Sequence, residues 1–350
     1  MVPFLDMQTR YRRTAEAVEP AVLAGMRSGR YIGGPVVSEA EQAIAKLLGH
    51  RHGVGVANGT VAITQILQAM GIGAGDEVIV PAATFFATAG AVLRAGATPV
   101  LVDVLAQRPL LDPDAVRAAL SPRTAAVMPV HLFGDVAPHP KVPVPVIDDA
   151  AQAVGACPAA GKGIAAAVSF YPTKILGVLG DGGMVLCDDP QLAGRVRELG
   201  FHGQRAAYHH HLTAGAMGGN SRLDALAAAA LLAQLPDLGT RIQLRQAIAA
   251  RYDAVVGELA IPRDPGSPVS IYCIRHPERD ALRERLQEQG VQTAIYYPRA
   301  LTEQPALAGC PRQPTPNAER FCAEALALPC YEGMPMADVE ATCAALRVCL

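Results

Sequence analysis

The sequence predicts an α/β protein with a large domain, built on a mostly parallel β-sheet flanked by helices, and a smaller C-terminal α+β domain. Strand and helix patterns alternate through the first two-thirds of the 350-residue chain, which is typical of a parallel sheet with helices on both faces. Two long helical patterns follow at 221–235 and 241–259. A proline- and glycine-rich stretch, 262–268, then precedes a tail of mixed strands and helices. We therefore expect the large domain at 1–238 and the small domain at 239–350.

The individual elements follow from local patterns of apolar residues. Short runs rich in Val, Ile and Ala predict strands of the large domain at 53–57, 77–81, 98–104, 124–129, 144–147, 166–171 and 184–187. Helical spacing predicts helices at 60–70 and 85–95, and Asp112-Pro113 supplies an N-cap and a first-turn proline for another. In the tail, the same patterns predict strands at 269–275 and 292–297, a helix at 278–290 and two further helices.

Composition and charge exclude several classes of protein. A hydrophobic fraction of 51%, a charged fraction of 18% and a net charge of -2 describe a globular chain without the basic field of a nucleic-acid-binding protein. The small basic cluster at Arg10, Arg12 and Arg13 is interpreted as a solvated helix face. No apolar run is long enough to cross a membrane, and the charges within 1–13 are atypical of a signal peptide. We expect a cytoplasmic protein without nucleic-acid or membrane partners.

Cysteine and histidine patterns give no sign of a metal site. The eight cysteines are scattered without a CxxC pair, so we expect neither disulfides nor zinc ligands. Three consecutive histidines, His209 to His211, would point in different directions, which favours a loop over a set of metal ligands.

Lys174 is the residue most indicative of function. It ends the run Ser169-Phe170-Tyr171-Pro172-Thr173-Lys174, between two β-type segments, and is followed by the glycine-rich stretch 177–183. Lysine is rarely buried because its charge must be desolvated, and a lysine held in apolar surroundings becomes a nucleophilic amine. One interpretation is a lysine that forms a Schiff base with pyridoxal phosphate (PLP). The alternative is a surface lysine in a strand–loop–strand connection.

A PLP enzyme needs further groups, which should lie at the carboxyl ends of the strands. A carboxylate must keep the pyridine nitrogen protonated, a flat group must cover the ring, and a helix N-terminus must hold the phosphate. Asn58-Gly59-Thr60 follows the first strand, Phe85 the second, and Asp148-Asp149 the strand at 144–147. Adjacent strand residues point to opposite faces, so at most one of these aspartates should face the site. Plain helix caps, and core packing for Phe85, remain the alternatives.

Taken together and in this order, these segments resemble the DegT/StrS-type sugar aminotransferases, which have the fold type I architecture of PLP-dependent enzymes. The resemblance covers nearly the whole chain and is most specific around Lys174 and Asp149. The motifs that carry it lie at 2–6, 28–35, 71–78, 129–134, 146–152, 169–183, 201–203, 219–224, 290–293 and 297–298.

The resemblance implies a role for each matching residue around the cofactor ring. Lys174 would bind the cofactor covalently and then move the proton between substrate and cofactor. Asp149 would pair with the pyridine nitrogen. Gln152 would form a hydrogen bond near the ring hydroxyl, and Phe85 would stack on the ring.

The resemblance also implies residues for the phosphate and the substrate. Gly59, Thr60 and Ser169 would hold the phosphate. Asn220, for which a plain N-cap is the alternative, would reach the phosphate of the cofactor in the neighbouring subunit. That role implies a homodimer whose active sites are shared across the interface. Tyr31 and Tyr296 are the candidate substrate residues.

The expected activity is transfer of an amino group, from glutamate or glutamine, to a keto-sugar that is expected to be nucleotide-linked, in amino-sugar or natural-product biosynthesis. Three segments, 134–145, 156–165 and 261–269, are shorter than in relatives, which motivates a cyclitol or a small non-nucleotide ketone as the alternative acceptor. A third hypothesis is a PLP-binding regulatory protein without catalytic activity. The retention of Lys174, Asp149 and Gln152 favours the enzyme.

Overall fold

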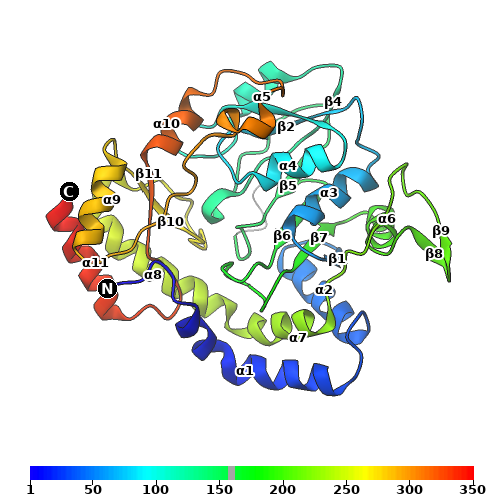
Figure 1. Cartoon of the computed structure of the whole chain (residues 1–350), viewed down its shortest axis with the longest axis horizontal. Helices are drawn as coiled ribbons and strands as arrows, with labels where there is room; N and C mark the ends of the chain where they lie inside the picture. The colour runs from blue at the N-terminus through cyan, green and yellow to red at the C-terminus, as the bar shows by residue number, and fades with distance from the viewer. Residues whose placement is uncertain (157–161) are drawn as a thin grey trace.

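The larger part of the fold is built around a central β-sheet (Figure 1). The computed structural model describes residues 1–156 and 162–350. The strands of the sheet lie in the order β3 (Thr98–Val102), β2 (Glu77–Pro81), β4 (Thr124–Val127), β5 (Ile147–Asp149), β6 (Ala165–Ser169), β7 (Gly183–Cys187) and β1 (His52–Val56). Two isolated parallel bridges, Val127 to Val146 and Val130 to Asp149, connect the β4 side of this sheet to the β5 side. Among the described strands of this sheet, β7 runs antiparallel to both of its neighbours, β6 and β1, and the other pairs are parallel. The predicted mostly parallel sheet is confirmed.

Helices cover both faces of the sheet because successive strand residues point to opposite sides. On one face, Ala165, Ala167 and Val185 pack in a core with helices α3 (Gly59–Ala69), α4 (Ala87–Arg94) and α6 (Pro190–Gly200). On the other face, Ala166, Val168 and Met184 pack with α2 (Pro35–Leu47) and α7 (Ala225–Gln234), and α5 (Pro113–Ala119) covers the strands at the far end. The long helix α1 (Met7–Arg27) lies along α7 (Figure 1).

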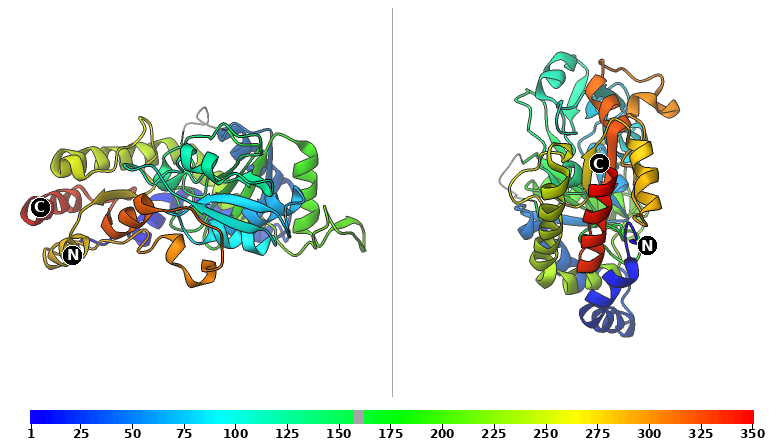
Figure 2. Two further views of the ribbon diagram at one scale, coloured as in Figure 1. Left: turned by 90° about the horizontal axis from the view of Figure 1, so that it is seen from above. Right: turned by 90° about the vertical axis from the view of Figure 1, so that its left-hand side faces the viewer.

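The C-terminal part has a core of its own. It contains helices α8 (Leu238–Val256), α9 (Arg279–Glu288), α10 (Pro316–Glu324) and α11 (Met336–Cys349), and the antiparallel strands β10 (Tyr272–Arg275) and β11 (Ala325–Leu328). Val2 is buried in this core and pairs with Val291, so the first residues lie against the C-terminal part. Figure 2 shows this part at one end of the molecule and the hairpin of β8 (Gln204–Ala206) and β9 (His209–His210) at the other. We retain the division at residue 238 as a proposal.

Several expected boundaries differ from the structure. The strand expected at 292–297 forms one isolated bridge, from Ala294 to Ala327. The helix expected from 221 starts at Ala225, because Asp224 is its N-cap and accepts a hydrogen bond from the Ala227 amide at 2.8 Å. Part of the loop expected at the consecutive histidines is the short exposed strand β9. Within the described ranges, the helices are all too short or too polar to span a bilayer.

The interpretation of Arg10 as part of a solvated helix face is wrong. Its side chain is buried, and its Nε donates a hydrogen bond of 2.7 Å to Glu332. The other guanidinium nitrogens donate to the backbone carbonyls of Pro172 and Lys174 at 2.9 and 2.6 Å. Arg12 and Arg13 are exposed, as expected. Helix α1 is therefore fastened to the loop that contains Lys174.

Candidate active site

A cavity of about 800 Å³ lies at the carboxyl ends of β1, β2, β5 and β6 and extends to the C-terminal part of the chain. Eight of the predicted site residues line it: Gly59, Thr60, Phe85, Asp149, Gln152, Ser169, Lys174 and Tyr296. Strand ends far apart in sequence meet here because the parallel strands all end at the same edge of the sheet. The other two predicted residues, Tyr31 and Asn220, do not line the cavity of their own chain.

One end of the cavity is suited to a phosphate group. Helix α3 begins at Gly59 after the N-cap Asn58, whose side chain accepts a hydrogen bond from the Val61 amide at 2.9 Å. The first amides of a helix lack partners within the helix and attract anions. A Cβ atom on Gly59 would lie 2.9 Å from the Cβ of Ser169, so only glycine allows this close approach. The Ser169 hydroxyl group adds a hydrogen-bonding group at the same place.

Asp149 supplies a buried carboxylate to the cavity. Its Oδ2 accepts a hydrogen bond of 2.8 Å from the Thr88 hydroxyl, and its Oδ1 accepts one of 3.2 Å from the Ala151 amide. Burial raises the pKa of Asp149, and these hydrogen bonds partly offset the effect. A cation such as a protonated pyridine nitrogen would favour the ionised carboxylate, so Asp149 fits the predicted role.

Thr88 is a site residue that sequence analysis missed. It lies at the start of α4, close to one helical turn after Phe85, which is the spacing that places two side chains on the same face of a helix. That spacing was the signal that could have identified it.

Lys174 is half-buried and lines the cavity with Asp149. Burial lowers the pKa of Lys174, and the negative charge of Asp149 partly opposes this change. The lowered pKa favours the neutral amine, which is the nucleophilic form. The backbone of Lys174 is fixed on both sides, since its amide donates to the Tyr171 carbonyl at 2.8 Å and its own carbonyl accepts from Arg10. The interpretation as an ordinary surface lysine is therefore disfavoured.

Gln152 and the aromatic residues surround the remainder of the cavity. The Gln152 Oε1 accepts a hydrogen bond from the Phe133 amide at 2.7 Å, and its Nε2 donates one of 3.1 Å to the Tyr297 hydroxyl. Burial raises the pKa of Tyr297, which keeps this hydroxyl group protonated. The ring of Phe85 lies 5.6 Å from that of Tyr297 and is 55% exposed, so it is available to a ligand and is not packed in the core.

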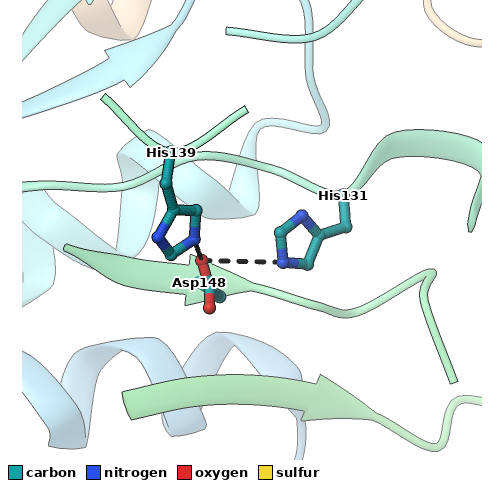
Figure 3. Close-up of side chains that lie close together, drawn as sticks. All are labelled: His131, His139 and Asp148. Carbon is teal, nitrogen blue, oxygen red and sulfur yellow. Dashed lines mark hydrogen bonds and ion pairs between the residues drawn. The ribbon is translucent and has the colours of Figure 1, made fainter. Parts of the chain in front are cut away.

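The adjacent Asp148 points away from this cavity and meets two histidines (Figure 3). Its Oδ1 lies 2.7 Å from Nε2 of His139 and 3.5 Å from Nε2 of His131, and its Oδ2 accepts a hydrogen bond of 2.8 Å from the Gly163 amide. Burial opposes ionisation, but the hydrogen bonds from the two histidines lower the pKa of Asp148 to about 2. The expectation that only one of the two aspartates faces the cavity is met.

This cluster has the residue types of a metal site, with one ligand atom of each residue within 4.8 Å of the others. However, Nδ1 of His131 accepts a hydrogen bond of 3.0 Å from the Ala137 amide, so a neutral ring carries its proton on Nε2. A histidine that binds a metal normally donates its other ring N–H to an acceptor, which is the opposite arrangement. We therefore interpret the cluster as a hydrogen-bond network that holds the Asp148 carboxylate ionised.

Tyr31 and Asn220 lie together on another part of the surface. Both are exposed, and their segments are adjacent because the Ala225 amide donates to the Tyr31 carbonyl at 2.8 Å and Ile32 bridges Asp224. The alternative interpretation of Asn220 as a plain N-cap is wrong, since α7 is capped by Asp224. The Asn220 side chain instead accepts hydrogen bonds from Arg222.

The fold and the cavity define the class of protein. A mostly parallel sheet carries a lysine amine, a buried carboxylate and a helix N-terminus at one edge, and this combination fits the PLP-dependent enzymes of fold type I. The sequence matches the profile of the DegT/DnrJ/EryC1/StrS aminotransferase family over residues 13–347. The chain belongs to this family. The predictions of fold type I, of a PLP-dependent aminotransferase and of PLP as the cofactor are confirmed.

Curated and solved relatives match almost the whole chain. It is 41% identical to the pleiotropic regulatory protein of Geobacillus stearothermophilus, with 94% of this chain and 93% of the relative covered. It is 36% identical to the UDP-2-acetamido-2-deoxy-3-oxo-D-glucuronate aminotransferase of Pseudomonas aeruginosa, with 99% of both chains covered. The crystal structure of NtdA from Bacillus subtilis, with bound cofactor PMP, is similar with a TM-score of 0.91 and 27% identity, covering 99% of this chain and 85% of that one.

Proposed function

We propose that the chain transfers an amino group from glutamate or glutamine to a nucleotide-linked keto-sugar. The observation that carries this proposal is that Lys174 and Asp149 line one cavity of about 800 Å³, which has room for more than the cofactor. The Pseudomonas aeruginosa relative, whose name states a UDP-linked keto-sugar acid as substrate, supports the choice of acceptor.

The cavity residues have separate tasks in such a reaction. Bound PLP would supply an electron-withdrawing ring that stabilises negative charge on the substrate carbon. Asp149, held by Thr88, would keep the proton on the pyridine nitrogen. The Lys174 Nζ would bind the cofactor and, once displaced by substrate, would carry the proton between the substrate carbon and the cofactor carbon. Gln152, which is held in place by its hydrogen bond to Tyr297, would form a further hydrogen bond near the ring hydroxyl and so orient the ring.

The phosphate and the ring face would be held by residues at the opposite wall. The amides of Gly59 and Thr60 at the start of α3, with the Ser169 hydroxyl, would bind the phosphate. The exposed ring of Phe85 would cover one face of the cofactor.

The position of Asn220 supports a homodimer with shared sites. Asn220 and Tyr31 lie outside the cavity of their own chain but form one exposed surface with Arg222. We propose that this surface meets the cavity of a second copy, where Asn220 would reach the cofactor phosphate and Tyr31 the substrate. The scattered cysteines are compatible with the reducing cytoplasm, which we propose as the location of the enzyme.

The three shortened segments do not favour the alternative acceptors. None of the described residues in 134–145, 156–165 and 261–269 lines the cavity. His139, in the first of these segments, instead contacts Asp148 on the side away from the cavity. The described residues of these segments therefore make no contact that would select a cyclitol or a small ketone. A nucleotide-linked acceptor is preferred because of the substrate named for the Pseudomonas aeruginosa relative.

Amino transfer can be tested in two halves. Purified holoenzyme is mixed with L-glutamate or L-glutamine, and the visible absorbance of bound PLP should disappear as the cofactor is aminated. A UDP- or dTDP-linked keto-sugar is then added, and the absorbance should return with formation of the amino-sugar, detected by mass spectrometry. Return of the absorbance with cyclitol ketones alone would favour the alternative acceptor. Bound PLP that responds to no amino donor would favour the regulatory protein.

A further inference from the structure

A second, small cavity of about 90 Å³ adjoins the main one on the side of Lys174. The two cavities share the wall formed by Gln152, Thr173, Lys174, Tyr296 and Tyr297. The volume corresponds to about three water molecules at ~30 Å³ each, so the small cavity can hold a carboxylate group but not a sugar or a nucleotide.

Ser270 and Arg245 are the hydrophilic residues of the wall that the main cavity does not share. The rest of that wall is formed by Phe4, Leu5, Ile271, Leu328 and Cys330. The Ser270 Oγ is buried and has no hydrogen-bond partner within the described ranges. A buried hydroxyl group without a partner costs free energy, unless a ligand or water completes its hydrogen bond. Ser270 therefore points to a polar occupant of this cavity.

The charge on this side of the molecule is unbalanced. Three buried guanidinium groups, those of Arg10, Arg241 and Arg245, share the single buried carboxylate of Glu332, at 2.7, 2.7 and 2.8 Å. Within the described ranges, no other carboxylate pairs with any of the three. Backbone carbonyls accept several of their remaining N–H groups, among them that of Ser270 from Arg245 at 3.1 Å. These dipoles reduce the excess positive charge without cancelling it, so an anion would be stabilised nearby.

We propose that the small cavity binds a carboxylate group of the amino donor, with Ser270 as its hydrogen-bonding residue. Arg245 would contribute positive charge, since its guanidinium group is already held by Glu332 and by the carbonyls of Val269, Ser270 and Cys330. The cavity adjoins the amine of Lys174, where the donor must react, and the excess positive charge favours an anion over a neutral group. The keto-sugar would occupy the larger cavity. This assignment of the donor subsite rests on the proposed function.

Binding of glutarate to the holoenzyme tests the assignment without catalysis. Glutarate carries the carboxylates of the donor but has no amino group, and neutral glutaramide has the same length. Titration calorimetry at constant ionic strength should show binding of glutarate, at least tenfold weaker binding of glutaramide, and little competition by chloride. Equal binding of both probes, or complete displacement of glutarate by millimolar chloride, would overturn the assignment.

Ser270→Ala locates the site. Loss of one hydrogen bond to a charged group should weaken glutarate binding about tenfold. Because the hydroxyl group has no partner in the protein, the substitution should leave the melting temperature unchanged. Ser267→Ala, at a buried serine that does not line the small cavity, is the matched control and should bind glutarate like the wild type. Unchanged glutarate affinity in Ser270→Ala would refute the role of Ser270.

Ser270→Asp places a carboxylate in the same position. The excess positive charge should stabilise it, so the variant should fold, lose glutarate binding and no longer be aminated by L-glutamate. Failure of this assignment is distinct from failure of the proposed function. If wild-type holoenzyme transfers amino groups but Ser270→Asp still binds glutarate, only the subsite is wrong. If no donor aminates the wild-type cofactor, the proposed function fails whatever the glutarate result.

Discussion

The guanidinium group of Arg10 donates a hydrogen bond of 2.6 Å to the backbone carbonyl of Lys174. Arg10 is in turn paired with Glu332, near the C-terminus of the chain. The loop that positions the predicted catalytic amine is thereby connected to both ends of the sequence. The stability of this arrangement depends on one buried carboxylate, which gives a first prediction.

Glu332→Gln should destabilise the protein in a pH-dependent way. Burial opposes ionisation, but Arg245, Arg10 and Arg241 lower the pKa of Glu332 from 4.5 to about 2. The ionised carboxylate therefore contributes stability above pH 4.5, and this contribution is lost as the pH falls towards 2. At 1.36 kcal/mol per pKa unit, the contribution is about 3 kcal/mol.

Urea unfolding of wild type and Glu332→Gln at pH 6, 4 and 3 measures this contribution. The difference in unfolding free energy should be greatest at pH 6 and should shrink at the lower values. Glu340→Gln, at an exposed position, is the control and should show no such trend. A constant difference between wild type and Glu332→Gln at all three pH values would contradict the assigned ion pairs.

Lys174→Ala should abolish amino transfer and leave the fold intact. The amine is the proposed nucleophile and proton carrier, whereas the contacts that hold this loop, from Arg10 and to Tyr171, use the backbone of Lys174 and not its side chain. Circular dichroism and melting temperature should match the wild type, while turnover falls to background. Lys141→Ala, at an exposed position, should retain full activity. Normal turnover in Lys174→Ala would rule out this lysine as the catalytic amine.

Asp149→Asn should still bind PLP but lose most activity, since a neutral amide cannot keep the ring nitrogen protonated. Thr88→Val should have a smaller effect, because it removes one hydrogen bond to the carboxylate and preserves the shape of the side chain. A hydrogen bond to a charged group is worth about 1.5–3 kcal/mol, so kcat/KM should fall roughly 10- to 100-fold. Steady-state kinetics of both variants provide the measurement. Full activity of Asp149→Asn would transfer the role to another carboxylate, first to Asp148.

His139→Ala should lower the free energy of unfolding by about 1–2 kcal/mol, since Asp148 loses one of its hydrogen-bond donors.

Zinc or EDTA should not change the melting temperature of the wild type. Nδ1 of His131 accepts a hydrogen bond from the Ala137 amide, which leaves the ring proton on Nε2, the atom that would have to bind the metal. Differential scanning calorimetry measures both effects. A rise in melting temperature with zinc that disappears in His139→Ala would show that the cluster is a metal site after all.

Asn220→Ala should be complemented by Lys174→Ala if the active sites are shared between subunits. In a mixed dimer, one of the two sites would combine a normal Lys174 with a normal Asn220 of the other chain. Co-refolding equal amounts of the two impaired variants should therefore restore about a quarter of wild-type activity. If Asn220 acts in its own chain, mixing restores nothing. Sedimentation analysis of the mixture verifies that dimers have formed.

Local sequence patterns were sufficient for much of the sheet and for the residues at its edge. Strand β2 and the placement of Lys174 and of the pair Asp148-Asp149 at strand ends followed from apolar runs, whereas the choice of Asp149 came from the family resemblance. The alternation of side chains along a strand also explained why Asp149 and its neighbour Asp148 face opposite sides. These features depend on residues close in sequence, which is why they could be predicted.

The remaining features depend on distant contacts. Arg10 resembles any exposed helix arginine until Glu332, 322 positions away, is placed beside it. The strand expected at 292–297 has the right residues but forms one isolated bridge, from Ala294 to Ala327. The start of helix α7 is an exception, because it depends on a local choice among neighbouring cap residues, of which Asp224 is the N-cap. Ser270 gave no local signal, since its importance comes from a cavity formed by separate segments.

Strands β6 and β7 are antiparallel, and their ends at Ser169 and Gly183 are paired opposite each other. The chain therefore leaves the sheet and returns to it at the same edge, and residues 170–182 form a loop whose two ends lie side by side. Its endpoints are held by the pairing of Ser169 with Gly183, while Phe170 and Leu176 anchor its interior in the core. This segment is thus a natural unit for building chimaeras, in which loops from other family members are transplanted onto this scaffold to compare how each presents its lysine.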